Sequence, residues 1–168
     1  MVIDVCDNFL ARKNAADLFE RLNNRGWTYG WIADKTTDSP ARHWHIGLAD
    51  NGYNAERSCL FALKDSKEFP ELVDLWYAIA KKLPYGHQPV RVYANAHTYG
   101  VEGRFHRDCP AGAGEMTALV YLNPVWKPSW GGATLFAPEG AASTCVLPVP
   151  GRLVIFQGDI PHCACAPS

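Results

Sequence analysis

The sequence lacks the features that would direct the protein to a membrane, a secretory route or nucleic acid. No apolar run approaches the ~18 residues of a membrane span, and the opening MVIDVCDNFLARKN has no basic region followed by an apolar core. Sixteen basic residues against 17 acidic ones leave a formal net charge of −1. This balance gives no electrostatic footprint for nucleic acid or for an anionic membrane. These absences predict a cytoplasmic protein with neither kind of partner.

Paired cysteines at zinc-site or redox spacing are also absent, because none of the six cysteines forms a C-x-x-C pair. Without a secretory signal they predict reduced thiols. The tightest pair, Cys163-x-Cys165, could bind a soft metal, but no second Cys or His pair lies at the spacing of a zinc site. The cysteines therefore indicate no disulfide framework.

Internal repeats, low-complexity segments and linkers are missing as well. A chain of 168 residues fits one domain that is large enough to bury a core. We therefore predict a single domain over residues 1–168, with a helical and strand support region at 1–88 and a catalytic core at 89–168.

Two segments of the first half predict amphipathic helices, because apolar residues recur at helical spacing in residues 8–25 and 69–83. Asp7 is the expected N-cap of the first helix, and Gly26 is its expected stop. Pro70 suits the first turn of the second helix, which Pro84 ends.

Strands are predicted between these helices and through the whole second half. WTYGWIA and RHWHIGLA alternate bulky and polar residues. From residue 89 onward, short β-prone runs are separated by Gly, Pro, Asn and Asp: PVRVYANAHTYG, RFHRD, EMTALVYLNPVW, GGATLFAP, TCVLPVP and GRLVIFQGD. Short, regularly spaced strands indicate a sandwich or barrel. The expected fold class is α+β, mainly β, with a jelly roll (double-stranded β-helix) and N-terminal supporting helices.

A histidine and a carboxylate two residues apart, His106 and Asp108 in RFHRDC, are the first hint of a metal site. Alone, this pair indicates only a polar turn. Near the end, however, the apolar run Leu153–Phe156 leads into a turn and then His162, which lies 162 − 108 = 54 residues beyond Asp108. Two histidines and one carboxylate form the facial triad of non-haem Fe(II) oxygenases. A zinc hydrolase can use the same ligands, so the metal stays open at this point.

The second half resembles the prolyl-4-hydroxylase-like branch of the Fe(II)/2-oxoglutarate-dependent dioxygenases. TYGVEGRFHRD, MTALVYLNPVWKPSWGGATLF and PVPGRLVIFQGDIPH carry the resemblance, over roughly residues 90–163. It implies that His106, Asp108 and His162 bind iron, with 2-oxoglutarate and O₂ as cosubstrates, and it adds ascorbate as a candidate reductant. The implied reaction hydroxylates a C–H bond and releases succinate and CO₂. Related halogenases have a small residue at the position of Asp108, so this carboxylate favours hydroxylation.

The resemblance also implies that Tyr121 donates its hydroxyl to the distal carboxylate of 2-oxoglutarate. Strand alternation places Thr117 and Leu119 on the face of Tyr121, where they would line the same cavity. By the same alternation Arg104 should face the pocket with His106, whereas Phe105 turns away. The expected substrate contacts are Arg104, Tyr99 and Asn95.

One element of the family pattern is missing, namely a Lys or Arg on a further strand beyond the distal histidine. The sequence ends at Ser168, six residues after His162, so we expect a jelly roll that lacks its last strand. Three explanations stay open: the encoded chain continues, a degenerate copy binds metal without turnover, or another base takes over the role, the candidates being Arg91, Lys127 and Arg152.

Three functions are compatible with these observations. The first is a hydroxylase for a prolyl or other amino-acid-like substrate, either a small molecule or part of a peptide. The second is a jelly-roll module that binds metal or ligand without catalysis. The third is a structural β-domain with two polar core histidines. His43-x-His45 is either a second metal site or part of an ordinary half-buried strand. The oligomeric state is not legible from the sequence.

Overall fold

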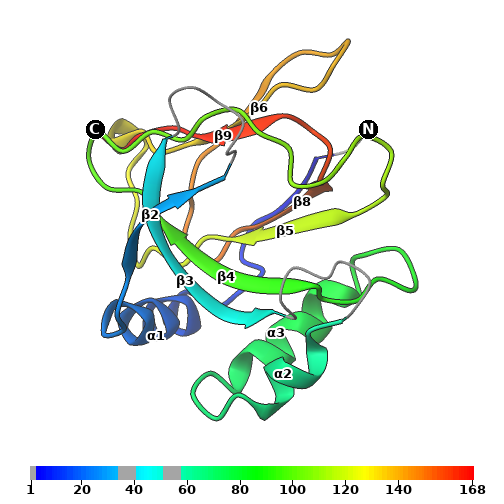
Figure 1. Ribbon diagram of the computed structural model, residues 1–168. Helices are drawn as coiled ribbons and strands as arrows, with labels where there is room; N and C mark the ends of the chain where they lie inside the picture. Colours follow the sequence, from blue (N-terminus) through cyan, green and yellow to red (C-terminus); the bar gives the residue numbers. More distant parts are fainter. Residues whose placement is uncertain (1–2, 34–40, 51–57) are drawn as a thin grey trace. The chain divides into compact units, whose positions relative to one another are not determined.

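The computed structural model describes residues 3–33, 41–50 and 58–168. The chain divides into two compact units, one made of Met1–Trp44 and Ala96–Ser168 and the other of His45–Asn95. This division into units does not test the prediction of a single domain over residues 1–168, which stays a prediction. Within the described ranges, no helix is long and apolar enough to cross a membrane. The elements follow one another as β1 (Asp4–Cys6), α1 (Arg12–Asn23), β2 (Thr28–Ile32), β3 (Arg42–Asp50), α2 (Leu60–Asp65), α3 (Glu71–Ala80), β4 (Arg91–Ala96), β5 (Met116–Val120), a 3₁₀ turn (Pro128–Trp130), β6 (Thr134–Phe136), β7 (Thr144–Val146), β8 (Leu153–Gln157) and β9 (His162–Ala164) (Figure 1).

The first predicted helix exists, but its start and its cap differ from the expectation. Helix α1 begins at Arg12, and Ala11 occupies the N-cap without a side-chain hydrogen bond. Asp7 instead accepts two hydrogen bonds from Arg152, with Nε–Oδ1 and Nη2–Oδ2 distances of 2.6 and 3.1 Å. The carboxylate of Asp7, which local spacing predicted as the helix N-cap, therefore forms an ion pair with the distant Arg152 instead. The backbone also leaves helical geometry at Asn8, which has a φ of 55°.

The other predicted elements are largely confirmed. Pro70 is the N-cap of α3, one position before the first turn in which it was expected. Helix α2 was not predicted, because six residues are too few to show a helical period. RFHRD was predicted as a strand, but it contributes only an isolated bridge between His106 and His162.

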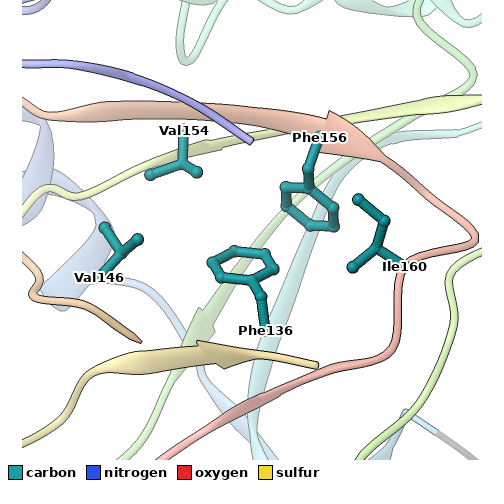
Figure 2. Packing of buried hydrophobic residues seen from close by; sticks show 5 residues of the cluster. All are labelled: Phe136, Val146, Val154, Phe156 and Ile160. Atoms are coloured by element: carbon teal, nitrogen blue, oxygen red, sulfur yellow. The ribbon is translucent and has the colours of Figure 1, made fainter. Parts of the chain in front are cut away.

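Two antiparallel sheets of the first unit enclose its core. Their strand orders are β1-β8-β5 and β7-β6-β9, and their side chains point toward each other in Figure 2. Phe136 of β6 and Phe156 of β8 meet edge to face, with ring centroids 4.9 Å apart. Burying such a side chain stabilises the fold by about 1.5–3 kcal/mol. The core cluster consists of Phe136, Val146, Val154, Phe156 and Ile160. The predicted jelly-roll class, mainly β with antiparallel sheets, is confirmed.

The last described residues extend the pairing of β9 along β6 and the turn before it. Cys165 N–H donates to the carbonyl of Ala133 at 2.8 Å, and Ser168 N–H donates to that of Trp130 at 2.9 Å. In register, Phe136 lies opposite His162. This ladder fixes His162 beside the phenylalanine core.

The second unit holds α2, α3, most of β3 and most of β4. Its buried side chains include Ile46, Leu63, Leu72 and Ile79. His45 Nδ1 lies 2.8 Å from Asn95 Oδ1 across the pair of strands.

Candidate metal centre

The structure brings His106, Asp108 and His162 together, with one ligand atom of each within 4.8 Å of the others. Backbone pairing does this directly, because the N–H of each histidine donates to the carbonyl of the other at 3.0 Å. Asp108 N–H donates to the carbonyl of Gly158 at 2.7 Å. Residues that are 50 or more positions apart in sequence are therefore held side by side by main-chain bonds.

Both imidazoles are oriented through their Nδ1 atoms. His106 Nδ1 lies 2.9 Å from the carbonyl oxygen of Arg104, and His162 Nδ1 lies 2.9 Å from that of Ile160. A carbonyl only accepts, so each Nδ1 carries a proton, and in the neutral imidazole each Nε2 then presents a lone pair. These Nε2 atoms lie 3.6 Å from Oδ1 and Oδ2 of Asp108, respectively. Neighbouring ligands bound ~2.1 Å from one ion lie about 3 Å apart, so a bound metal would draw the three donors closer together.

Aromatic packing surrounds the distal histidine. The ring centroid of His162 lies 4.7 Å from that of Phe156 and 5.9 Å from that of Phe136. Burial lowers the pKa of His162 below its ordinary value, although the Asp108 carboxylate opposes this effect. The neutral imidazole is the form that binds a metal.

Thr117 fixes the carboxylate. Its hydroxyl donates to Oδ2 of Asp108 at 2.5 Å, and β5 places Thr117 opposite Phe156 of β8. The sequence indicated only that Thr117 lines the cavity wall. The hydrogen bond further makes it a positioning residue for Asp108, because a hydroxyl at this distance restricts the rotation of the carboxylate.

We expect Thr117→Val to weaken binding of Fe(II) by about 10- to 100-fold, since partners that orient metal ligands typically have effects of this size. Anaerobic calorimetric titration with Fe(II) measures the change. Thr144→Val, at an exposed position of β7, is the matched control and should bind like the parent protein. Equal affinity of the two variants would show that the hydrogen bond does not orient Asp108.

Tyr121 keeps its phenolic proton in a partly buried position. Burial raises the pKa of Tyr121 to about 12, and its hydroxyl lies 2.7 Å from Thr134 Oγ1. Tyr121 and Leu119 both pack against the core cluster, as the predicted alternation of β5 requires. A protonated phenol here can donate to a carboxylate. Sequence reasoning did not single out Thr134, although its spacing from Phe136 places both on one face of β6.

The three bases considered as substitutes for the family's Lys or Arg have other contacts. Arg152 binds Asp7 and donates to the carbonyl of Leu147 at 2.9 Å. The Nζ of Lys127 lies 5.5 Å from the ring centroid of Trp130. Arg91, in the second unit, stacks over Tyr93 at 4.7 Å. The contacts of Arg152 join Asp7 near the start of the chain to the segment before β8, and its role as a substitute base stays a prediction.

The expected substrate residues are not gathered in one place by the contacts of the structure. Arg104 and Phe105 are both exposed. Gly103 pairs with Ala164 and His106 pairs with His162, so two residues, Arg104 and Phe105, lie opposite the single residue Cys163. The simple alternation assumed for RFH therefore does not hold at this point. Tyr99 is 84% exposed, and Asn95 bonds His45 within the second unit. Their contact with substrate stays a prediction.

The histidines of RHWHIG take different environments. His43 is buried and stacks on His97, with ring centroids 4.8 Å apart, whereas His45 contacts Tyr93 and Asn95 in the second unit. Among the described residues, only His106, Asp108 and His162 form a group that could hold a metal ion. A second site on this strand is therefore not supported.

Comparison with known proteins agrees with this geometry. Residues 93–168 match the model of the 2OG-Fe(II) oxygenase superfamily. A Pseudomonas putida prolyl-4-hydroxylase is similar in structure, with a TM-score of 0.68 and 18% identity over 98% of this chain and 85% of that one. A Trichoplax adhaerens prolyl hydroxylase, solved with a peptide fragment of the hypoxia-inducible factor oxygen degradation domain, gives 0.72 and 17% over 98% and 77%. A Burkholderia pseudomallei 2OG-Fe(II) oxygenase family oxidoreductase gives 0.61 and 12% over 98% and 78%. No curated protein matches the sequence.

Residues 93–168 are thus similar to the dioxygenases that use iron and 2-oxoglutarate. The chain carries a 2OG-Fe(II) oxygenase domain, matched over residues 93–168, on a fold like that of the prolyl-4-hydroxylases. The resemblance recognised in the sequence is thereby confirmed, and the His-Asp-His group lies inside the matched part.

Proposed function

We propose that the protein is an Fe(II)/2-oxoglutarate-dependent hydroxylase in which His106, Asp108 and His162 bind the iron. The observation that carries the proposal is the convergence of two Nδ1-anchored imidazoles and one carboxylate within 4.8 Å. The substrate class that we propose is a prolyl or other amino-acid-like group, free or within a peptide. The fold of the prolyl hydroxylase neighbours supports this choice.

When bound, the iron supplies oxidative decarboxylation of 2-oxoglutarate to succinate and CO₂, coupled to oxygen insertion into a C–H bond. The protein's part is to hold and orient. The backbone bonds of His106 and His162 fix two ligands, and Thr117 fixes the third. Three ligands on one side leave the remaining positions for the cosubstrates. Burial against Phe156 excludes water on the side of His162.

Tyr121 is our proposal for the residue that binds the distal carboxylate of 2-oxoglutarate. Its pKa of about 12 keeps the proton available for donation, and Thr134 holds the oxygen in place. Without 2-oxoglutarate, the hydroxyls of Tyr121 and Thr134 hydrogen-bond each other. A bound carboxylate would replace this hydrogen bond with one from Tyr121 to the carboxylate oxygen. Thr117 and Leu119 complete this wall of the proposed cavity.

A non-catalytic binding module is the second candidate, because Arg152 is committed to Asp7. Among the described residues, Tyr121 shares its hydrogen bond with Thr134, and Arg152 influences it only through its charge. Such a module would hold the metal and fail to turn over. The two candidates therefore differ in one observable, the release of succinate.

The test is anaerobic titration of the protein with Fe(II) and then 2-oxoglutarate, followed by exposure to O₂. We expect a visible charge-transfer band and release of succinate above that of a metal-free sample. A band without succinate, even in the presence of candidate substrates, identifies the binding module. Absence of the band removes both metal-dependent functions. Cys163→Ser, beside His162 but with a sulfur outside the donor group, is the control and should retain the band.

A further inference from the structure

An open groove lies in the first unit, and one residue of its wall, Arg104, is two positions before His106. It has a volume of about 230 Å³ and is lined by Tyr29 of β2, Arg42 of β3, and Val101, Glu102 and Arg104 of the loop before His106, with Ala41 and Gly100 completing the wall. Pockets for drug-sized ligands typically enclose about 300–1,000 Å³. This groove is therefore of a size for one small polar molecule.

The groove is connected to the metal centre by the chain itself. The carbonyl oxygen of Arg104, in the groove wall, holds Nδ1 of His106 at 2.9 Å. The extra residue between Gly103 and His106 turns both Arg104 and Phe105 outward from regular strand pairing. The side chain of Arg104 thus lines the groove, while its backbone carbonyl orients the predicted metal ligand His106.

The charges of the groove are two guanidinium groups and one carboxylate. Within the ranges that the structure describes, Arg104 and Glu102 form no salt bridge, with each other or with another residue. The only described hydrogen bond of the Arg42 guanidinium is a long one of 3.5 Å to the carbonyl of Gly30. Most donors of both arginines therefore stay available for an anion, and Glu102 stays available for a cation.

We infer that this groove binds a free amino acid as its zwitterion, with the α-carboxylate at Arg42 and Arg104 and the α-ammonium at Glu102. This deepens the proposed function and rests on it, because it names the substrate of the same oxygenase site. Guanidinium forks match carboxylates in geometry as well as charge. An internal residue of a peptide carries neither terminal charge and would leave all three groups without a partner. The groove therefore selects against it.

Equilibrium dialysis tests the inference on protein loaded anaerobically with Fe(II) and 2-oxoglutarate, and in parallel on metal-free protein. The probe is a pool of the twenty proteinogenic amino acids, quantified by mass spectrometry. We expect enrichment of at least one amino acid. Its N-acetyl and amide derivatives should each bind at least about tenfold more weakly, the loss expected for one charge-assisted contact. The doubly capped derivative should not be retained.

Two variants assign the charges. Arg104→Gln should weaken binding of the free acid and leave the amide derivative nearly unchanged, since the amide has no carboxylate to lose. Glu102→Gln should weaken the free acid and leave the N-acetyl derivative unchanged. A merely structural effect would lower all three affinities together. Arg12→Gln, an exposed change of equal charge on α1 outside the groove, is the matched control.

Retention of no free amino acid in either sample overturns the inference, as does equal binding of the capped forms. Neither result affects the proposed function, because the charge-transfer band requires only Fe(II) and 2-oxoglutarate and is measured without an amino acid. Conversely, loss of the band with enrichment in the metal-free sample would leave the groove as a binding site and remove the oxygenase.

Discussion

Asp108→Ala is expected to weaken Fe(II) binding by more than about 100-fold and to abolish succinate release. Asp108 supplies the one negative charge among the three donors, and the two remaining imidazoles are neutral ligands. Removing a residue that only orients a ligand already costs about 10- to 100-fold, so removing a ligand itself should cost more. The change also leaves the hydroxyl of Thr117 without its acceptor. Anaerobic calorimetry with Fe(II), and succinate detection after addition of O₂, measure the two effects.

Asp17→Ala is the matched control for this variant. Asp17 lies on α1 and pairs with Lys13 at an exposed position, so its loss removes an equal charge far from the donors in sequence. Exposed pairs of this kind contribute about 0–1 kcal/mol to stability. Both variants should unfold near the temperature of the parent protein. Retention of Fe(II) affinity in folded Asp108→Ala would contradict the assignment of the facial triad.

The metal ligands could be predicted from sequence because their residue types and order state the chemistry directly. The fold has only to bring His106, Asp108 and His162 close together, and the sequence motifs that flank them identified such a fold. The same holds for the face shared by Thr117, Leu119 and Tyr121, which follows from the period of a strand. These features could be predicted because each depends on neighbouring residues in the sequence or on a recognisable sequence motif.

The contacts that hold the site in shape could not be predicted, because they join residues with no sequence signal for each other. Asp7 looks like a helix cap until Arg152, 145 positions away, approaches it. The extra residue between Gly103 and His106 depends on the pairing of that segment with β9. The partnership of Tyr121 with Thr134 depends on how two sheets face each other. In each case a contact between residues distant in the sequence determines the structure, in place of the interaction that the local sequence favours.

Gly151 is the position where we expect the largest loss of stability from a single methyl group. It has a φ of 75°, and a Cβ added there would overlap the carbonyl oxygen of Leu10. Both backbone groups of Gly151 are engaged, since its carbonyl accepts from Leu10 N–H at 3.0 Å and its N–H donates to the carbonyl of Tyr121 at 2.9 Å. The glycine thus ties the segment before α1 to the end of β5, and neither neighbour can move without breaking a hydrogen bond.

Gly151→Ala should therefore lower the free energy of unfolding by about 4 kcal/mol or more, which lies in the tail of single-substitution effects. For a chain of this size that corresponds to a fall in Tm of roughly 8 °C or more. Gly140→Ala separates the two causes, because Gly140 has a similar φ of 71° and no atom within 4 Å of an added Cβ. The control pays only the left-handed backbone cost of about 1–2 kcal/mol. Thermal and urea unfolding of both variants give the difference, and equal losses would show that the approach of Leu10 to Gly151 relaxes at no cost. A larger loss for Gly151→Ala would instead show that this contact holds the strand end carrying Tyr121 against the start of the chain.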